Sequence, residues 1–462
     1  MLHVVILAAG KGTRMKSSLP KVAHLLAGRP VIDHVVRAGS ALAPTTTTVV
    51  VGHGADEVRR ALGNWPDAQF VVQSPQLGTG HALLQAESVL AGRKGTVLLL
   101  YGDVPLLTTT TLQRLLEHHR GSRAALTVLT TELDDPYGYG RIVREKGRIA
   151  RIVEERDASS EERAIHEINS GIYAIEVEGL FEGLRALAAD NDQDEYYLTD
   201  LVAAYVREGR RVETAGVEDP TELRGINTRV NLADLTGVLL DHTRRRLMLA
   251  GVTLEDPASA AIDIDVEIGQ DTIISPNVSL TGATRIGTGC RIGPGTRITE
   301  STIGNDVTVL DHSVIVQSTV ADGCRVGPFA HLRPDSRLAE GARVGNFVEL
   351  KKTTLGPGSK ANHLSYLGDA TIGANVNVGA GVITCNYDGA SKNETRIEDD
   401  VFVGSDSQLV APVTVGAGAY IAAGSTVTDD VPPGSLAVAR SRQTNKDGWA
   451  ARRAARLQKK AH

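Results

Sequence analysis

The stretch IGQDTIISPNVSLTGATRIGTGCRIGPGTRI, residues 268–298, decides the fold of the second half of this 462-residue chain. An aliphatic residue returns every six positions within it, at Ile268, Ile274, Leu280, Ile286, Ile292 and Ile298. This period fits neither an α-helix nor a strand hairpin, and it is typical of a parallel β-helix in which each hexad is one short strand and one turn. We expect the aliphatic side chains to point inward and to stack, and the glycines beside them to give the corners their backbone freedom.

The repeat continues to the end of the globular sequence. Its register slips by one residue at Ile303, and the pattern then runs through Val309, Ile315, Val326, Leu332, Leu338, Val344 and Leu350 to a late block at Ile397, Val403, Leu409, Val415, Ile421 and Val427. Three hexads make one coil of about 18 residues, so the region holds roughly ten coils. The period breaks at residues 386–395, where we expect a loop on one face, often the binding face of a solenoid.

The first half of the chain has a different pattern, in which strand-like and helix-like segments alternate. Expected strands are 4–8, 47–51, 69–72, 97–100 and 125–129, and expected helices include 31–43 and 110–119. Alternation of this kind predicts an α/β, Rossmann-like domain with a mostly parallel sheet, whose ligands bind beyond the carboxyl ends of the strands. A leucine-rich segment at residues 228–250 follows, with no glycine between 238 and 250, and predicts one long joining helix. We therefore divide the chain into residues 1–226, a linker helix at 227–250, and a solenoid with its tail at 251–462.

Composition narrows the class of protein. The net charge of -6 gives no basic field for nucleic acid. The apolar run at residues 3–9 is too short to span a membrane and lacks the charged start of a signal peptide. The three cysteines, Cys290, Cys324 and Cys385, form no CxxC pair, which fits a reducing cytoplasm. The basic run Arg244–Arg246 is a solvated helix face or an anion site, and the basic tail at 440–462 is disordered or packs across a neighbouring chain.

Residues able to hold a nucleotide follow the first expected strand. The segment LAAGKGTRM at residues 7–15 lets backbone N–H groups approach phosphates, and Lys11, Arg14 and Lys21 can neutralise a triphosphate. Asp103 ends an apolar strand, so its carboxylate faces the ligand crevice, where it can hold Mg²⁺.

The solenoid carries its own candidate site. Arg333 and Lys351 are 18 residues apart, so we expect them to stack on one face and, with Tyr366, to form a pocket for a sugar phosphate. Transfer of an acyl group to an amine needs the amine unprotonated, and His363 is suited to take its proton.

These motifs together resemble one family. LAAGKGTRM, LPK at 19–21, QLGTGHA at 76–82, YGDVPL at 101–106, GYGRIV at 138–143, EINSG at 167–171 and GIN at 225–227, followed by the hexapeptide solenoid, are similar in order and spacing to the bifunctional N-acetylglucosamine-1-phosphate uridylyltransferases / glucosamine-1-phosphate N-acetyltransferases. The resemblance covers essentially the whole chain. It implies a left-handed β-helix, uridylyl transfer from UTP in residues 1–226 and acetyl transfer from acetyl-CoA in residues 251–462.

The resemblance also implies roles for individual residues. The UTP and UDP-N-acetylglucosamine site would comprise Leu7, Ala8, Ala9, Gly10, Lys11, Arg14, Lys21, Gln73, Gly78, Thr79, Tyr101, Gly102, Asp103, Gly140, Glu154, Asn169 and Asn227, with Asp103 and Asn227 as Mg²⁺ ligands. The acetyl site would use His363 as general base, would hold glucosamine 1-phosphate through Arg333, Lys351, Tyr366 and Asn377, and would hold acetyl-CoA through Ala380, Asn386, Tyr387, Ser405, Ala423 and Arg440. In this family three chains build the acetyl site, so a homotrimer is implied, with small molecules as substrates and no membrane or nucleic-acid partner.

One departure from the family pattern stands out, and two other readings stay open. Relatives tend to carry a second lysine near position 394, where this chain has Glu394, which reduces the positive charge offered to coenzyme A. The first alternative is a nucleotidyltransferase with a purely structural, trimerising solenoid, and the His363, Arg333 and Lys351 group argues against it. The second is a regulatory subunit without activity, and the intact Lys21, Asp103 and Asn227 argue against that.

Overall fold

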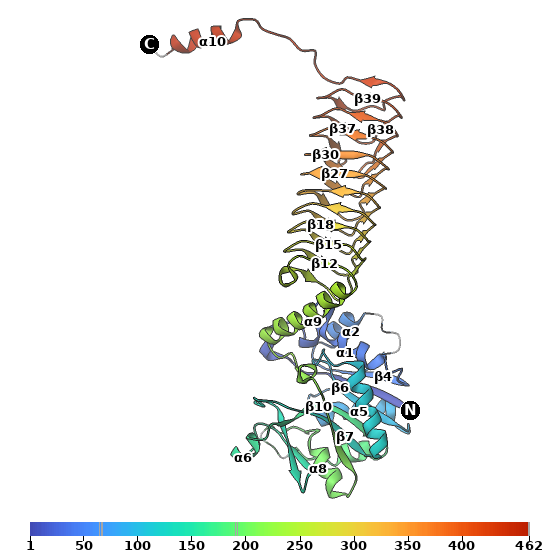
Figure 1. The fold of residues 1–462 in the computed structure, drawn as a ribbon, viewed down its shortest axis with the longest axis vertical. Coiled ribbons are helices and arrows are strands. Elements are labelled where there is room, and N and C mark those ends of the chain that lie inside the picture. Colours follow the sequence, from blue (N-terminus) through green and yellow to red (C-terminus); the bar gives the residue numbers. More distant parts are fainter. Residues whose placement is uncertain (64, 66–67, 190, 192, 461–462) are drawn as a thin grey trace. The chain divides into compact units, whose positions relative to one another are not determined.

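The computed structural model describes residues 1–63, 65, 68–189, 191 and 193–460, and the chain divides into two compact units, Met1–Leu239 and Leu240–His462. Figure 1 shows helices around a sheet in the first unit and a stack of coils in the second. None of the helices in the described residues is long and apolar enough to cross a bilayer.

Unit 1 is built on a mixed sheet whose strand order is β11-β7-β10-β6-β1-β4-β5. Strands β1, β4, β5 and β6 are mutually parallel, as are β7 and β11, whereas β10 runs antiparallel between β6 and β7 and also pairs with the β8–β9 hairpin. The strands are β1 (Leu2–Ala8), β4 (Thr46–Val51), β5 (Ala68–Val72), β6 (Thr96–Tyr101), β7 (Leu126–Glu132), β8 (Gly140–Glu145), β9 (Arg148–Val153), β10 (Glu167–Glu176) and β11 (Val212–Gly216). The mostly parallel sheet expected from the sequence is confirmed.

The sheet is covered on both faces, and its central strands β1 and β6 are largely apolar. Alternate residues of β1 enter different cores: Val5 and Leu7 face one, and Val4 and Ile6 face the other. The first core is closed by helices α3 (Thr79–Leu84), α7 (Leu180–Arg185) and α8 (Asp200–Arg207), and the second by α1 (Val31–Ser40), α2 (Ala55–Leu62) and α5 (Thr109–Ser122). Short helices α4 (Glu87–Leu90) and α6 (Ser160–Arg163) lie in the connections.

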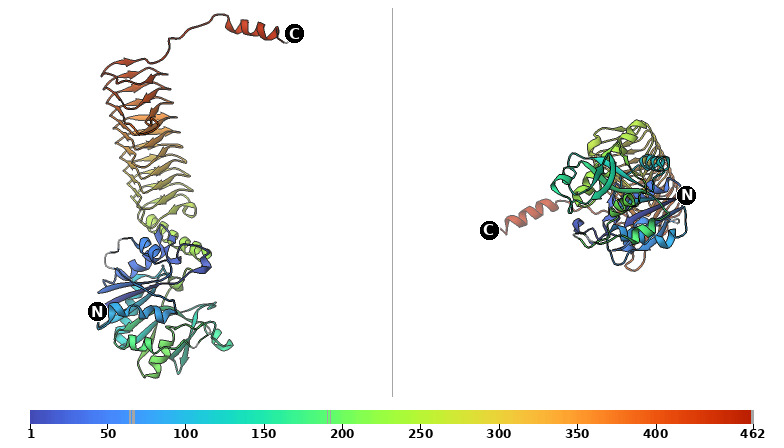
Figure 2. Two further views of the ribbon diagram at one scale, coloured as in Figure 1. Left: turned by 180° about the vertical axis from the view of Figure 1, so that it is seen from behind. Right: turned by 90° about the horizontal axis from the view of Figure 1, so that it is seen from below.

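Unit 2 is a left-handed parallel β-helix of three sheets with 11, 10 and 9 strands. Sheet 1 runs from β12 (Thr253–Leu254) to β41 (Leu436–Ala437), sheet 2 from β13 (Ala261–Ile262) to β40 (Thr426–Val427), and sheet 3 from β14 (Glu267–Ile268) to β38 (Val413–Val415). Figure 2 shows the successive coils from behind. The hexad residues form one continuous core, in which Ile298, Ile315 and Leu332 are fully buried.

The register of the coils follows the sequence repeat. Ile286 pairs with Ile303, 17 residues on, as the one-residue slip predicts, and Leu332 pairs with Leu350 at the full 18. The loop at 386–395 lengthens one coil, so that Thr371 pairs with Arg396. The strands around this loop are β25 (His331–Leu332), β27 (Arg343–Asn346), β28 (Glu349–Lys351), β30 (Lys360–His363), β31 (Tyr366–Gly368), β33 (Asn377–Val378) and β34 (Ile383–Cys385).

Two helices frame the solenoid sequence. Helix α9 (Arg229–Leu249) occupies the segment for which the sequence predicts a long helix, and Leu247 near its end joins the solenoid core at 1 % exposure. Helix α10 (Trp449–Gln458) lies in the basic tail and has no buried residue. The tail is therefore helical in part, and its helix is not buried against the other described residues of the chain.

Candidate active sites

A cavity of about 600 Å³ in unit 1 collects most of the nucleotide-site residues predicted from the sequence. Because β1 and β6 are neighbours and parallel, with Leu7 opposite Tyr101, the loops that follow both strands open at the same edge of the sheet. The lining includes, of the predicted residues, Leu7, Ala8, Ala9, Gly10, Lys11, Arg14, Lys21, Gln73, Gly78, Thr79, Tyr101, Asp103 and Asn227. Gly102 does not line it; its N–H donates to the Leu7 carbonyl at 2.9 Å and so fixes the two loops to each other.

A polar network lies at the mouth of this cavity. Lys21 Nζ donates to Asp103 Oδ2 and, at 3.0 Å, to Asn227 Oδ1, which also accepts a hydrogen bond of 2.9 Å from Arg14 Nη2. One ammonium group thus lies between a carboxylate and an amide oxygen from segments far apart in sequence. Carboxylate and amide oxygens completed by substrate phosphates are the donor set that Mg²⁺ prefers, so Asp103 and Asn227 fit that ion.

The sugar-site residues predicted from the resemblance form a second cluster. A Cβ on Gly140 would lie 3.5 Å from both Asn169 Cβ and Glu154 Oε2, so a larger side chain would fill the gap between them. Asn169 Oδ1 accepts hydrogen bonds from Tyr173 and from the Gly171 N–H, which orients its amide nitrogen. Burial raises the pKa of Glu154, against a hydrogen bond of 3.2 Å from Thr199.

Tyr101 connects the cavity with this cluster. Burial raises the pKa of its phenol, and the negative charge of Glu154 adds to the effect, while Thr79 opposes it as a hydrogen-bond partner. A Cβ on Gly171 would lie 2.9 Å from the Tyr101 ring, so the ring is tightly held. The structure thus brings the predicted nucleotide and sugar residues into two adjoining groups.

In unit 2, His363 ends strand β30 on an exposed edge of the solenoid, and its Nδ1 lies 2.9 Å from Asn346 Oδ1, one coil earlier. An amide oxygen can only accept a hydrogen bond, so Nδ1 carries the proton and donates it to Asn346 Oδ1, and the lone pair of the neutral ring is on Nε2. The arrangement is that of an oriented general base.

Four of the six residues predicted to bind acetyl-CoA continue the same edge, one per coil: Ala380, Ser405, Ala423 and Arg440. The Ala380 carbonyl accepts from the Asp406 N–H, and the Ser405 carbonyl accepts from the Gly424 N–H beside Ala423. A Cβ on Gly424 would lie 3.5 Å from Arg440 Cδ. We call the edge formed by His363, Ala380, Ser405, Ala423 and Arg440 the donor track. Its coils are spaced about 4.8 Å apart, so it is about 19 Å long, and its small side chains leave it open.

Beside the track, sheet 2 carries the predicted phosphate-binding residues. Leu332 pairs with Leu350, so Arg333 and Lys351 follow on adjacent strands and the predicted stacking is observed. Arg333 donates to Glu349 at 2.8 Å. A Cβ on Gly368 would approach both the Tyr366 hydroxyl and Asn386 Nδ2, so these two groups lie together.

The loop at 386–395 contributes to the same face. Asn386 donates to Asp369 at 2.5 Å and is buried, so it anchors the loop, whereas Tyr387 is exposed. Asn377 lies on sheet 1 rather than sheet 2. Glu394 accepts from Thr371 at 2.7 Å and pairs with Arg396 at 3.2 Å, so much of its charge is compensated locally.

Sequence reasoning missed several residues of these sites. The neighbouring like-charged Lys351 lowers the pKa of Lys392, so the two side chains lie close together and could both reach one anion. Asn346, Thr199 and Gln76, whose side chain donates to the Ala9 carbonyl, were also missed. The 17-residue separation from His363, one coil, was the available signal for Asn346.

Models of known protein families match segments of both units. The MobA-like NTP transferase domain matches residues 4–198, the GMPPB C-terminal domain matches 257–361, and six repeats of the bacterial transferase hexapeptide match 394–429. Proteins named bifunctional protein GlmU are similar over nearly their whole length. The relative from Trichlorobacter lovleyi is 53% identical over 96% of this chain and 97% of its own, that from Pelobacter propionicus 51% over 96% and 97%, and that from Heliobacterium modesticaldum 51% over 97% and 98%. At this identity and coverage, the chain belongs to the family of the bifunctional GlmU proteins, which confirms the resemblance found in its motifs.

Proposed function

We propose that this chain completes UDP-N-acetylglucosamine in two steps. Unit 2 acetylates glucosamine 1-phosphate with acetyl-CoA, and unit 1 transfers UMP from UTP to the N-acetylglucosamine 1-phosphate, releasing pyrophosphate. The observation that carries the proposal is the oriented imidazole of His363 at the start of the donor track and beside the face with Lys351 and Lys392. A purely structural solenoid has no need for an oriented base next to two neighbouring cations.

In acetyl transfer, His363 Nε2 takes a proton from the sugar ammonium group, while the Nδ1–H group of the same ring remains hydrogen-bonded to Asn346 Oδ1. The amine nitrogen then attacks the thioester carbonyl, and the new N–C bond forms as the C–S bond breaks. The imidazolium returns its proton to the leaving sulfur, and the second proton that the nitrogen loses on becoming an amide passes to solvent. Lys351, Lys392 and Arg333 hold the 1-phosphate, and Ala380, Ser405, Ala423 and Arg440 hold coenzyme A along the track.

In uridylyl transfer, the 1-phosphate oxygen attacks the α-phosphorus of UTP in line with the departing pyrophosphate. No protein nucleophile is needed, because this chemistry depends on positioning and on charge neutralisation. Lys11, Arg14 and Lys21 neutralise the phosphates, and Gly140, Glu154 and Asn169 orient the sugar. Asp103 and Asn227 would hold Mg²⁺, which would supply further neutralisation of the phosphate charge.

The test is to supply glucosamine 1-phosphate, acetyl-CoA, UTP and Mg²⁺ and to identify the products by mass spectrometry. We expect N-acetylglucosamine 1-phosphate, then UDP-N-acetylglucosamine with equimolar pyrophosphate. Thiol release is measured alongside without UTP. UDP-sugar formed only from preformed N-acetylglucosamine 1-phosphate, with no thiol released, would favour the alternative of a structural solenoid.

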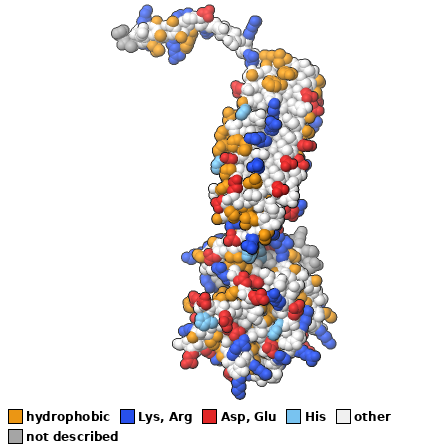
Figure 3. Space-filling model, in the orientation of Figure 1, with side chains coloured by type: hydrophobic (Ala, Val, Ile, Leu, Met, Phe, Trp, Pro, Cys, Tyr) orange, Lys and Arg blue, Asp and Glu red, His pale blue; other side chains and the backbone are white. Residues whose placement is uncertain are grey.

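We further infer a homotrimer assembled through the solenoid, acting in the cytoplasm, where its three free thiols are stable. An apolar ladder runs beside the donor track: Phe329 and Phe347 stack at 5.4 Å between ring centroids and are 48% and 57% exposed, and Leu364, next to His363, is 61% exposed. Figure 3 shows hydrophobic side chains exposed along the solenoid. Such a ladder, with both phenylalanines at the left-handed backbone angles of the corner, is better suited to burial against a second copy than to water.

We expect the double variant Phe329→Asp/Phe347→Asp to sediment mainly as a monomer and to lose most acetyl transfer while uridylyl transfer remains. Charges placed in an apolar contact must be desolvated without partners, which opposes assembly. The matched control is Thr302→Asp/Thr319→Asp, at exposed positions on successive coils of sheet 3, which should leave the sedimentation unchanged. A wild-type chain that sediments as a fully acetylating monomer would rule out the shared site.

A further inference from the structure

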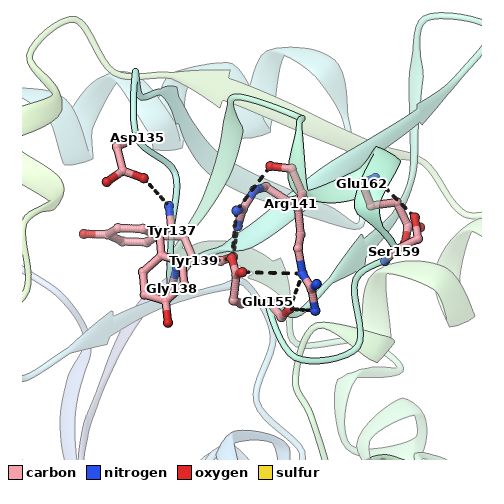
Figure 4. Close-up of polar contacts among 9 residues, drawn as sticks. Asp135, Tyr137, Gly138, Tyr139, Arg141, Glu155, Ser159 and Glu162 are labelled. Carbon is pink, nitrogen blue, oxygen red and sulfur yellow. Dashed lines mark hydrogen bonds and ion pairs between the residues drawn. The ribbon is translucent and has the colours of Figure 1, made fainter.

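The β8–β9 hairpin carries an ion pair of a buried arginine and a partly exposed glutamate, which belongs to none of the groups described above. Arg141 is 1% exposed, and its Nη2 donates to Glu155 Oε2 at 2.7 Å. Figure 4 shows the two side chains meeting beside Gly138 and Tyr139, in the loop that precedes β8. The Glu155 side chain is 20% exposed, so the arginine is the buried member of the pair. A guanidinium keeps its charge at any ordinary pH, so burying Arg141 requires that it keep this partner.

Both members of the pair also hold the main chain of that loop. Arg141 Nη1 donates to the Tyr139 carbonyl, and Glu155 Oε2 accepts the Gly138 N–H at 3.2 Å. Gly138 has a φ of 86°, a left-handed conformation that is readily adopted only by glycine. The loop is thus fixed through one N–H and one C=O, and the residue that follows it is Gly140 of the sugar cluster.

The same pair fixes the other side of the sugar cluster. Glu154 and Glu155 are consecutive residues after the end of β9, in a turn closed by a hydrogen bond of 3.1 Å from the Asp157 N–H to the Glu154 carbonyl, so the position of one side chain constrains the backbone that carries the other. With Glu155 held by Arg141, Glu154 is directed toward Gly140 and Thr199. A displacement of the ion pair therefore moves both walls of the gap in which the sugar would lie, while the nucleotide loop at 7–15 has no contact with it.

We propose that Arg141 and Glu155 are positioning residues for the acceptor sugar in uridylyl transfer. The pair holds the Gly138–Tyr139 loop and Glu154 at the separation that the sugar phosphate requires. This inference rests on the function proposed for unit 1, and it assigns a role to two residues that do not touch the substrate.

The experiment measures uridylyl-transfer kinetics of the full chain with Arg141→Lys and Glu155→Gln. Lysine keeps the charge but cannot bind Glu155 and the Tyr139 carbonyl at once, and glutamine keeps an acceptor for Gly138 but removes the charge. We expect the KM for N-acetylglucosamine 1-phosphate to rise by about 10- to 100-fold, and the KM for UTP to stay within about twofold, because a misplacement of 1 Å has effects of this size.

The matched control is Arg144→Lys, which breaks the Arg144–Glu167 pair, at 2.7 Å, on the same strand but outside the sugar cluster. In this control variant the KM values for N-acetylglucosamine 1-phosphate and for UTP should both be unchanged. Acetyl transfer by unit 2 reports the amount of intact chain in each sample, and if Arg141→Lys does not fold, Glu155→Gln decides. Equal rises in both KM values, or a lower kcat with neither KM changed, would overturn the positioning role. A wild-type chain without uridylyl transfer would instead refute the proposed function.

Discussion

His363→Ala should lower the rate of acetyl transfer by about 100- to 10,000-fold, the usual cost of losing a general base. The structure gives the reason at the level of atoms. Asn346 holds the Nδ1 side of the ring, so the free lone pair is on Nε2 at the open edge of the solenoid. Alanine removes that lone pair and leaves the phosphate-binding cations in place, so KM for glucosamine 1-phosphate should change less than kcat.

Thiol release from acetyl-CoA measures this effect, and uridylyl transfer from preformed N-acetylglucosamine 1-phosphate is the control in the same sample. Asn346→Ala should have a smaller effect than His363→Ala, since it frees the imidazole to rotate but leaves the base present. If His363→Ala kept most of its turnover at neutral pH, the base assignment would be wrong, and acetyl transfer would have to depend on positioning alone.

Asp103→Ala should produce the second large effect, a loss of uridylyl transfer of at least about 100-fold with acetyl transfer near normal. Lys21 contacts both Asp103 and Asn227, so removal of the carboxylate takes away the proposed metal ligand and also releases Lys21 from its position. Asp103→Asn separates these effects, because it keeps a side chain of the same shape without the charge.

Pyrophosphate release measures this loss, and Asp56→Ala, at a strongly exposed acid in the same unit, is the control that should retain full activity. Titration with Mg²⁺ adds a second measurement: Asp103→Asn should need more of the ion for half-maximal rate. Parallel loss of both activities in a folded Asp103 variant would show that the two sites depend on each other.

Much of the fold was predictable, because the solenoid core repeats with the sequence and the sheet of unit 1 has a core on each of its two faces. Each hexad sends one aliphatic side chain inward, so the six-residue period specifies both the buried positions and the neighbouring coil, including the slip at Ile303. Strands β1 and β6 of unit 1 are largely apolar, as expected of strands whose two faces are both covered. The antiparallel β10 was not predicted. It pairs with strands distant in the sequence, and its register with β7 shifts between Asn169 and Tyr173, so no local period marks it.

The residues of the candidate sites could be predicted where they belong to a sequence motif or to the coil repeat. The loop at 7–15 and Asp103 lie beside strands whose ends must face the crevice, and Arg333 and Lys351 follow from the length of a coil. The approach of Lys392 to Lys351 depends on the conformation of the 386–395 loop, which has no repeat. The Arg141–Glu155 pair depends on the pairing of the hairpin, in which Arg141 lies opposite Val153.

The donor track has a further consequence, because its length is a whole number of coil spacings. Its reach from His363 to Arg440 is set by the number of coils between them, and each coil contributes about 4.8 Å. The coils share one continuous aliphatic core, so a coil added or removed between Ser405 and Ala423 would leave that core packed. Only the distance from His363 to the Arg440 end of the track would change. A change in the number of coils could therefore adapt a solenoid of this kind to an acyl carrier of another length, without any change at His363.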